Sequence, residues 1–389
     1  MTRRKQLLLG CLASLAGFAL VLALAEVVFR LLPVMSAMRP DPVTEGSPTY
    51  HYLPDQSFVF SRDWNLDMVN RGRVNNAGFI NDQDYRRNGQ EPLLAIIGDS
   101  FIEAFMVPYA NTVQGRLARA LGSKARVYSF AASGAPLSQY LIWARLAVRE
   151  YGAQALIINV VGNDFDESHI HYVQSPGFWV YAPGTDGHLR MQLVELRRGL
   201  MRSLLAHSVF ARYLFINLHL KEYAKLRSLR AHSSGDEQVR FAGFTRADAD
   251  PARISDSLAV MDAFFRDLPE YTGLPPDRIT FTTDGFRYPK AAAEGKGTYF
   301  DQMRNAFEQR ALGRGYEVLD LDRWFFSDFR QFGERFEYPH DGHWNDRGHA
   351  IAARAILSSR LLARPPFDGA SERASAANRL KEARSASMR

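Results

Sequence analysis

The chain has 389 residues, of which 46% are hydrophobic, 12% aromatic and 23% charged. This composition is sufficient for a large buried core, and it excludes a chain that is disordered, collagen-like or a coiled coil throughout. The single cysteine, Cys11, excludes a disulfide framework and any cysteine-rich zinc or iron–sulfur site.

The formal net charge is +6 at pH 7 and the sequence pI is about 9.4, values that often accompany nucleic-acid binding. The excess lies at the two ends of the chain. Arg3, Arg4 and Lys5 contribute +3, and residues 364–389, with six basic and three acidic side chains, contribute another +3. The rest of the chain is therefore neutral overall, and we expect no nucleic-acid partner.

The N-terminal region, residues 1–32, has the pattern of a membrane signal-anchor. Residues 7–25 are nineteen residues without a charge, and at about 1.5 Å per residue this run comes close to the roughly 30 Å of a bilayer's hydrocarbon core. Basic residues before the run predict that the N-terminus stays in the cytoplasm and that the chain after the span is translocated across the membrane. Ala23-Leu24-Ala25 keeps a cleaved signal peptide open as an alternative. We expect a single-pass protein of the inner membrane with a periplasmic body.

After residues 33–90, a predicted stalk and irregular lead-in, short apolar runs alternate with segments of helical spacing. The predicted strands are 93–97, 126–130, 155–161, 278–283 and 317–321, and the predicted helices are 111–121, 137–150, 252–268, 296–313 and 346–362. This alternation predicts an α/β domain over residues 91–363, with a roughly five-stranded parallel sheet between two helical layers.

A helical insertion over about 165–250 interrupts this domain, and within it residues 191–230 carry eight basic and two acidic residues. We predict a long basic helix there, which either contacts anionic lipid headgroups, guides an acidic glycan, or is an ordinary solvated face. Residues 364–389, rich in Ala, Ser and Arg, are predicted to be a disordered basic tail.

Polar residues that suit acyl transfer follow the predicted strands, where catalytic groups of an open parallel sheet collect. Ser100 follows the first strand and is a candidate nucleophile, with His343 as its base and Asp341 as the group that fixes the histidine tautomer. The Ser100 N–H, the Gly134 N–H and the Asn163 amide are candidate donors to an oxyanion.

In this order the segments Gly98-Asp99-Ser100, Ser133-Gly134, Gly162-Asn163-Asp164 and Asp341-Gly342-His343 resemble the four blocks of SGNH hydrolases, also called GDSL-like lipases and esterases. The resemblance covers about residues 93–362. It implies a three-layer, flavodoxin-like α/β/α fold, ester chemistry through an acyl-serine, no cofactor, and the roles given above for Ser100, Gly134, Asn163 and His343. Asp99 is expected to brace the turn rather than to catalyse.

The last block departs from the common pattern because Asp341 precedes His343 by two residues rather than three. This Asp-x-His-Trp form resembles that of alginate O-acetylation proteins, although in those proteins the pair precedes the nucleophile. The resemblance implies a membrane-anchored extracytoplasmic esterase or O-acyltransferase for acetyl groups on cell-envelope or exported polysaccharide, with a membrane-bound acyl donor as a possible partner. The alternative is an inactive SGNH fold that binds glycan or scaffolds a biosynthetic complex.

Histidine and aspartate clusters raise the question of a metal. The segment 340–349 holds three histidines and two aspartates, but a metal there would leave the nucleophile and oxyanion blocks unexplained, so we expect neither metal nor cofactor. His349 is expected to be structural. His169 and His171 are expected to line a surface or to be solvated rather than to be ligands.

Overall fold

The computed structural model describes residues 2–197, 205–218, 220, 249–339 and 341–368. The chain divides into two units. The first comprises residues 1–39, 57–71 and 198–236, and the second comprises residues 40–56, 72–197 and 237–389. Each unit is described by itself.

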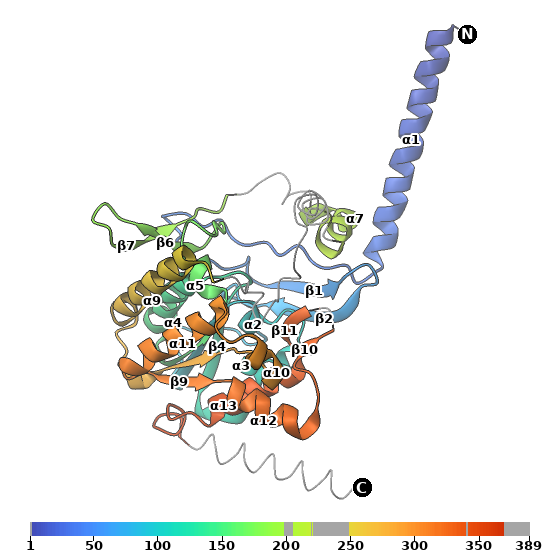
Figure 1. Cartoon of the computed structure of the whole chain (residues 1–389). Coiled ribbons are helices and arrows are strands. Elements are labelled where there is room, and N and C mark those ends of the chain that lie inside the picture. The colour runs from blue at the N-terminus through green and yellow to red at the C-terminus, as the bar shows by residue number, and fades with distance from the viewer. Residues whose placement is uncertain (1, 198–204, 219, 221–248, 340, 369–389) are drawn as a thin grey trace, which may run out of the picture. The chain divides into compact units, whose positions relative to one another are not determined.

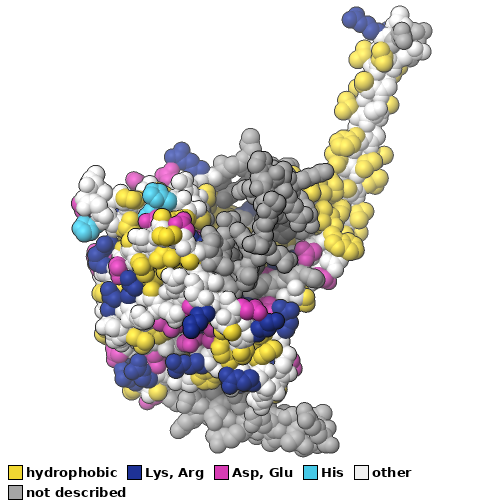
Figure 2. Space-filling view, viewed as in Figure 1, with side chains coloured by type: hydrophobic (Ala, Val, Ile, Leu, Met, Phe, Trp, Pro, Cys, Tyr) yellow, Lys and Arg dark blue, Asp and Glu magenta, His cyan; other side chains and the backbone are white. Residues whose placement is uncertain are grey.

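The first unit is built on a long N-terminal helix, α1 (Arg3–Arg30). Its apolar side chains are exposed along its length, as Figure 2 shows, and by length and composition it can cross a membrane, a test that a signal sequence also passes. Near its end, Glu26 accepts hydrogen bonds from the backbone N–H groups of Val209 and Phe210, both at 3.0 Å. These residues begin α7 (Val209–Arg212), which continues as one π-helical turn over Tyr213–Asn217. Residues 57–71 of the hairpin formed by β1 (Gln56–Arg62) and β2 (Asp67–Val74) also belong to this unit.

The second unit contains the predicted parallel sheet. Its five strands lie in the order β4-β3-β5-β8-β9, and the strands are β3 (Leu93–Gly98), β4 (Arg126–Ala131), β5 (Ala153–Val160), β8 (Ile279–Thr283) and β9 (Glu317–Asp320). All neighbouring pairs are parallel. Numbered within the sheet, this is the 2-1-3-4-5 order of flavodoxin-like folds, whose ligands bind where the strand order reverses.

Helices cover both faces of the sheet (Figure 1), which confirms the predicted three-layer α/β/α architecture. One layer consists of α3 (Val113–Leu121), α12 (Asp322–Phe332) and α13 (Asp346–Leu357). The other consists of α4 (Leu137–Tyr151), α9 (Pro251–Thr272) and α11 (Tyr299–Gly313). Shorter elements complete the unit: α2 (Ser100–Glu103), α5 (Asp164–Glu167), α10 (Pro289–Glu294), and the hairpins β6 (Trp179–Pro183) with β7 (Leu189–Leu193) and β10 (Glu337–Tyr338) with β11 (Asp341–Trp344).

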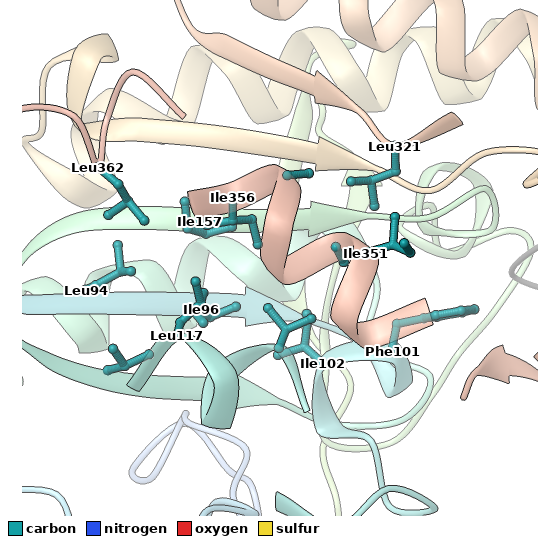
Figure 3. Packing of buried hydrophobic residues seen from close by; sticks show 14 of the residues in the cluster. Leu94, Ile96, Phe101, Ile102, Leu117, Ile157, Leu321, Ile351, Ile356 and Leu362 are labelled. Carbon is teal, nitrogen blue, oxygen red and sulfur yellow. The ribbon is translucent and has the colours of Figure 1, made fainter. Parts of the chain in front are cut away.

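The burial of these strands explains why their sequences are continuous apolar runs. Every residue of β3 and β4 is buried, as expected for strands covered on both faces. In Figure 3, Ile356 of α13 lies against Ile157 of β5, and Leu94 and Ile96 of β3 lie beside them. The packed core therefore holds rigid the strand ends from which the polar blocks emerge.

The lead-in and the insertion differ from the prediction. Residues 33–90 contain the hairpin β1–β2, and the segment predicted as helix from residue 191 begins as strand β7. Leu189-Arg190-Met191-Gln192-Leu193 alternates apolar and polar residues with a period of two, which favours a strand. The helix prediction at 191–193 was therefore wrong. Most of the basic segment, and the tail from residue 369, lie outside the described residues.

A core substitution tests this packing. Leu117 of α3 is fully buried, whereas Leu312 of α11 is 56% exposed. We expect Leu117→Ala to lower the free energy of unfolding by about 2–5 kcal/mol because it leaves a cavity, and Leu312→Ala to change it by no more than about 0.5 kcal/mol. Urea unfolding of the detergent-solubilised chain, followed by tryptophan fluorescence, measures both. Equal effects of the two substitutions would contradict the packing described above.

Candidate active site

The nucleophile candidate lies at a sharp turn between β3 and the one-turn helix α2. A Cβ on Gly98 would come within 2.5 Å of the Ile102 side chain, so the turn requires glycine there. Asp99 accepts the Phe101 N–H at 3.0 Å and caps α2, in agreement with its expected bracing role. Ser100 is the first residue of this turn and is partly exposed, so its hydroxyl is presented at the carboxyl end of the sheet.

Ser100, His343 and Asp341 form one hydrogen-bonded chain, although Ser100 lies 243 residues before His343 in the sequence. The Ser100 Oγ lies 2.7 Å from His343 Nε2, and His343 Nδ1 hydrogen-bonds Oδ1 of Asp341. The backbone N–H of His343 also donates to Asp341, at 3.0 Å. The Asp341 side chain is 1% exposed and that of His343 is 15% exposed. Since Ser100 Oγ is 3.4 Å from Asp99, its better partner is the imidazole.

A buried ion pair supports the strand that carries Asp341 and His343. Arg287, in the loop after β8, donates to the carbonyl oxygen of Gly342 at 2.6 Å and to Asp284 at 2.5 Å. The same carboxylate accepts the indole N–H of Trp344 at 3.2 Å. The Arg287 side chain is 4% exposed and that of Asp284 is fully buried. The Arg287–Asp284 pair therefore holds β11 through Gly342 and Trp344, on either side of His343. No motif in the sequence predicts this pair.

The two remaining predicted residues follow strands that flank β3. Gly134, after β4, has a φ of +73°, and a Cβ there would meet nothing within 4 Å, so its backbone faces open space. Asn163, after β5, hydrogen-bonds the carboxyl group of Glu167. Its Oδ1 is buried and has no hydrogen-bond partner among the described residues. The structure thus brings Gly134, Ser100 and Asn163 to one edge of the sheet, and their convergence on a substrate oxygen belongs to the proposed function.

Glu103 was not predicted, yet it joins the nucleophile turn to the loop of Gly134. Its carboxylate accepts the backbone N–H of Ser133 at 2.8 Å, the Ser133 hydroxyl, and the Tyr52 hydroxyl at 2.6 Å. The residue is 2% exposed, and burial raises the pKa of its carboxyl group to about 7. The available signal in the sequence was a lone carboxylate in the apolar stretch 101–107, three residues after Ser100.

Further acidic groups are buried around the same strand ends. Burial raises the pKa of Asp99 to about 6 and that of Glu167 to about 8. Asp164 accepts the Tyr140 hydroxyl at 2.9 Å and the Val161 N–H at 2.8 Å, and its role is to fix the turn after β5. His349 is buried and accepts the Val113 N–H at 3.3 Å, which fits its expected structural role.

The sequence and the fold were compared with those of known proteins. No protein-family model matches the sequence, and no curated protein matches it. Among solved structures, the chain is similar to an α/β hydrolase from the metagenome of Lake Arreo (12% identity, 69% of this chain and 94% of that chain, TM-score 0.38). It is similar to a member of the lipolytic G-D-S-L family from Veillonella parvula (10%, 69% and 97%, TM-score 0.35). It is also similar to an acetylxylan esterase of Geobacillus stearothermophilus (12%, 70% and 95%, TM-score 0.34).

These neighbours include SGNH hydrolases, the family whose four blocks the sequence resembles. Since the identities are at most 12% and the TM-scores are below 0.5, the argument for chemistry rests on the side chains described above.

The buried Glu103 predicts a specific pH dependence of stability. Its pKa of about 7 in the folded protein exceeds the ordinary 4.5, so the folded state holds this proton more tightly than the unfolded state. Protonated Glu103 therefore adds to the free energy of unfolding below about pH 4.5, and this contribution is lost as the pH rises through about 7. Glu103→Gln removes it. We expect the difference in the free energy of unfolding between the parent and Glu103→Gln (parent minus variant) to fall by up to about 3 kcal/mol from pH 4.5 to pH 8.

Urea unfolding at several pH values measures this difference. Glu270→Gln, which changes an exposed glutamate on α9, is the matched control and should follow the parent at every pH. A difference between the parent and Glu103→Gln that stays constant or rises with pH contradicts the prediction.

Proposed function

We propose that this chain is a serine hydrolase that acts on ester bonds through an acyl-Ser100 intermediate. The observation that carries the proposal is the hydrogen bond of 2.7 Å between Ser100 Oγ and His343 Nε2, with Asp341 on the other ring nitrogen. A serine hydroxyl becomes a nucleophile when a neighbouring base accepts its proton, and a buried carboxylate orients that base.

Each residue has a defined task in the reaction. His343 accepts the Ser100 proton as Oγ attacks the ester carbonyl carbon, and Asp341 stabilises the imidazolium that forms. His343 then protonates the leaving alcohol, and the acyl group remains on Ser100. In the second half-reaction His343 deprotonates the acceptor, which attacks the acyl carbon, and then returns this proton to the Ser100 Oγ as the acyl–oxygen bond breaks. Water as the acceptor makes the protein an esterase, and a sugar hydroxyl makes it an O-acyltransferase.

The negative charge on the carbonyl oxygen needs donors at the same edge of the sheet. In the proposal these are the backbone N–H groups of Ser100 and Gly134 and the amide of Asn163. The Asn163 amide nitrogen has two N–H donors, so one can serve the oxyanion while the other bonds Glu167, its partner in the structure. Glu103 acts indirectly, because it holds the loop of Gly134 against the nucleophile turn through Ser133.

For location and substrate we propose an inner-membrane protein anchored by α1, with an extracytoplasmic domain that acts on acetyl groups of cell-envelope or exported polysaccharide. Three features support this: the apolar helix, the basic residues before it, and the likeness of Asp341-Gly342-His343-Trp344 to alginate O-acetylation proteins. A membrane-bound acyl donor would be the partner of the transferase form.

Removal of any triad member tests the nucleophile assignment. We expect Ser100→Ala and His343→Ala to lower kcat/KM for p-nitrophenyl acetate at least about 10³-fold and Asp341→Asn to act in the same direction, since the three side chains act as one unit. Intact-mass spectrometry of the acetylated parent should place one acetyl group on Ser100.

Ser123→Ala, at an exposed serine in the short 3-10 helix Gly122–Lys124, is the matched control and should keep the parent rate. Circular dichroism verifies that each variant is folded. Hydrolysis at the parent rate by folded Ser100→Ala, or no acetyl adduct on the parent, would reject the enzyme assignment in favour of an inactive glycan-binding or scaffolding protein.

The choice between hydrolysis and transfer is tested by an added acceptor. In the transferase form, millimolar oligosaccharide should increase p-nitrophenol release from p-nitrophenyl acetate and divert acetyl groups from acetate to sugar, because both acceptors compete for one acyl-enzyme. Mass spectrometry of the sugar and an enzymatic acetate assay quantify the two products. Ser100→Ala serves as the blank. Acetate as the sole product at every acceptor concentration rejects transfer and leaves the esterase.

A further inference from the structure

A second cluster of chemically active side chains lies outside the triad, where the chain after Asn163 meets α9. His169 follows α5, His171 comes two residues later, and Asp256 lies on the second turn of α9. The three residues offer ligand atoms that all lie within 4.8 Å of one another. The fold thus brings a carboxylate to two imidazoles that are about 85 residues away in the sequence.

The backbone around this cluster is held in place by protein contacts. The N–H of Ile170 donates to the Tyr181 carbonyl at 3.0 Å, and the N–H of Tyr181 donates to the Ser168 carbonyl at 2.7 Å, so β6 fixes the position of His169. Arg253 of α9 forms an ion pair with Asp166 at 2.8 Å, which fixes α9 against the same segment. Two of the ligand positions are therefore set by the fold, and the third, His171, is exposed and can adjust.

The donor set also has the supporting contacts that metal ligands use. The hydroxyl of Tyr172 donates to Oδ2 of Asp256 at 2.8 Å, so one carboxylate oxygen is oriented and the other remains for a ligand role. His169 is 3% exposed, and its Nδ1 accepts the N–H of His171 at 3.3 Å. A metal ion must compete with this long hydrogen bond, which costs little to break.

We propose that His169, His171 and Asp256 form a binding site for a divalent transition-metal ion, with Zn²⁺ as the best fit. Two histidines and a carboxylate, with a water molecule in the open position, are a ligand set typical of zinc. Bonds of about 2.0–2.1 Å place tetrahedral ligand atoms about 3.4 Å apart. Separations near the limit of 4.8 Å therefore have to shrink on binding, and the exposed His171 is able to adjust. The ion would fasten the segment after β5 to α9, in addition to the Arg253–Asp166 pair, and would take no part in the ester chemistry.

The site is tested with the full chain in detergent, without a histidine tag, after EDTA treatment and removal of the chelator. We expect one equivalent of Zn²⁺ by elemental analysis, a rise of a few degrees in Tm at saturating Zn²⁺, and, with Co²⁺ as a probe, the visible absorption of a tetrahedral complex. His171→Ala and Asp256→Asn should weaken binding at least about tenfold.

His188→Ala removes an exposed histidine from the β6–β7 turn and is the matched control, which should bind as the parent does. Absence of stoichiometric binding by the parent overturns the proposal. Binding that survives in His171→Ala but is lost in His343→Ala also overturns it, because the ion would then lie on the proposed triad.

Discussion

The placement of one imidazole ring is the constraint on which the described site depends. His343 has to reach Ser100 with one nitrogen and Asp341 with the other, and its backbone N–H also bonds Asp341, so the strand β11 has little freedom. The ion pair of Arg287 with Asp284 supplies this rigidity from the loop after β8. A buried arginine and aspartate contribute little net stability when paired, but the loss of one partner leaves an uncompensated charge. Their value here is positional, since they hold Gly342 and Trp344 on either side of the histidine.

A second feature of the site is a group of buried carboxyl side chains with raised pKa values. Asp99, Glu103, Asp164 and Glu167 all lie near the carboxyl ends of β3 and β5, and burial raises the pKa of each. Carboxyl groups that stay partly protonated limit the repulsion that four negative charges would create around Ser100 and its developing oxyanion. The cost appears at higher pH, where these groups ionise and the turns that they brace lose stability.

The sequence predicted the fold well because the buried strands are uninterrupted apolar runs. The order of blocks indicated Ser100 because it follows the first predicted strand, and His343 because it precedes the last predicted helix. Glu103, Arg287 and Asp284 could not be found in this way, since their importance comes from partners 30 to 60 residues away in the sequence. The spacing of Leu193, Leu196 and Leu200 favours a helix, but the alternation of apolar and polar residues at 189–193 forms the strand β7. No sequence pattern links His169 and His171 to Asp256, because only the packing of α9 brings the three residues together.

The exposure of the triad bears on the choice between water and sugar as the acceptor. In the described residues Ser100 is partly exposed, the His343 side chain is 15% exposed, and the backbone of Gly134 faces open space. An acyl group on Ser100 would therefore be open to water as well as to a carbohydrate hydroxyl. A transferase with such a site cannot depend on the exclusion of water and must favour the sugar by binding it close to the acyl carbon. Tight binding of the acceptor raises its effective concentration, by orders of magnitude where the geometry is good. Selectivity for transfer would then reside in glycan contacts around the site, and the triad itself would be the same in either enzyme.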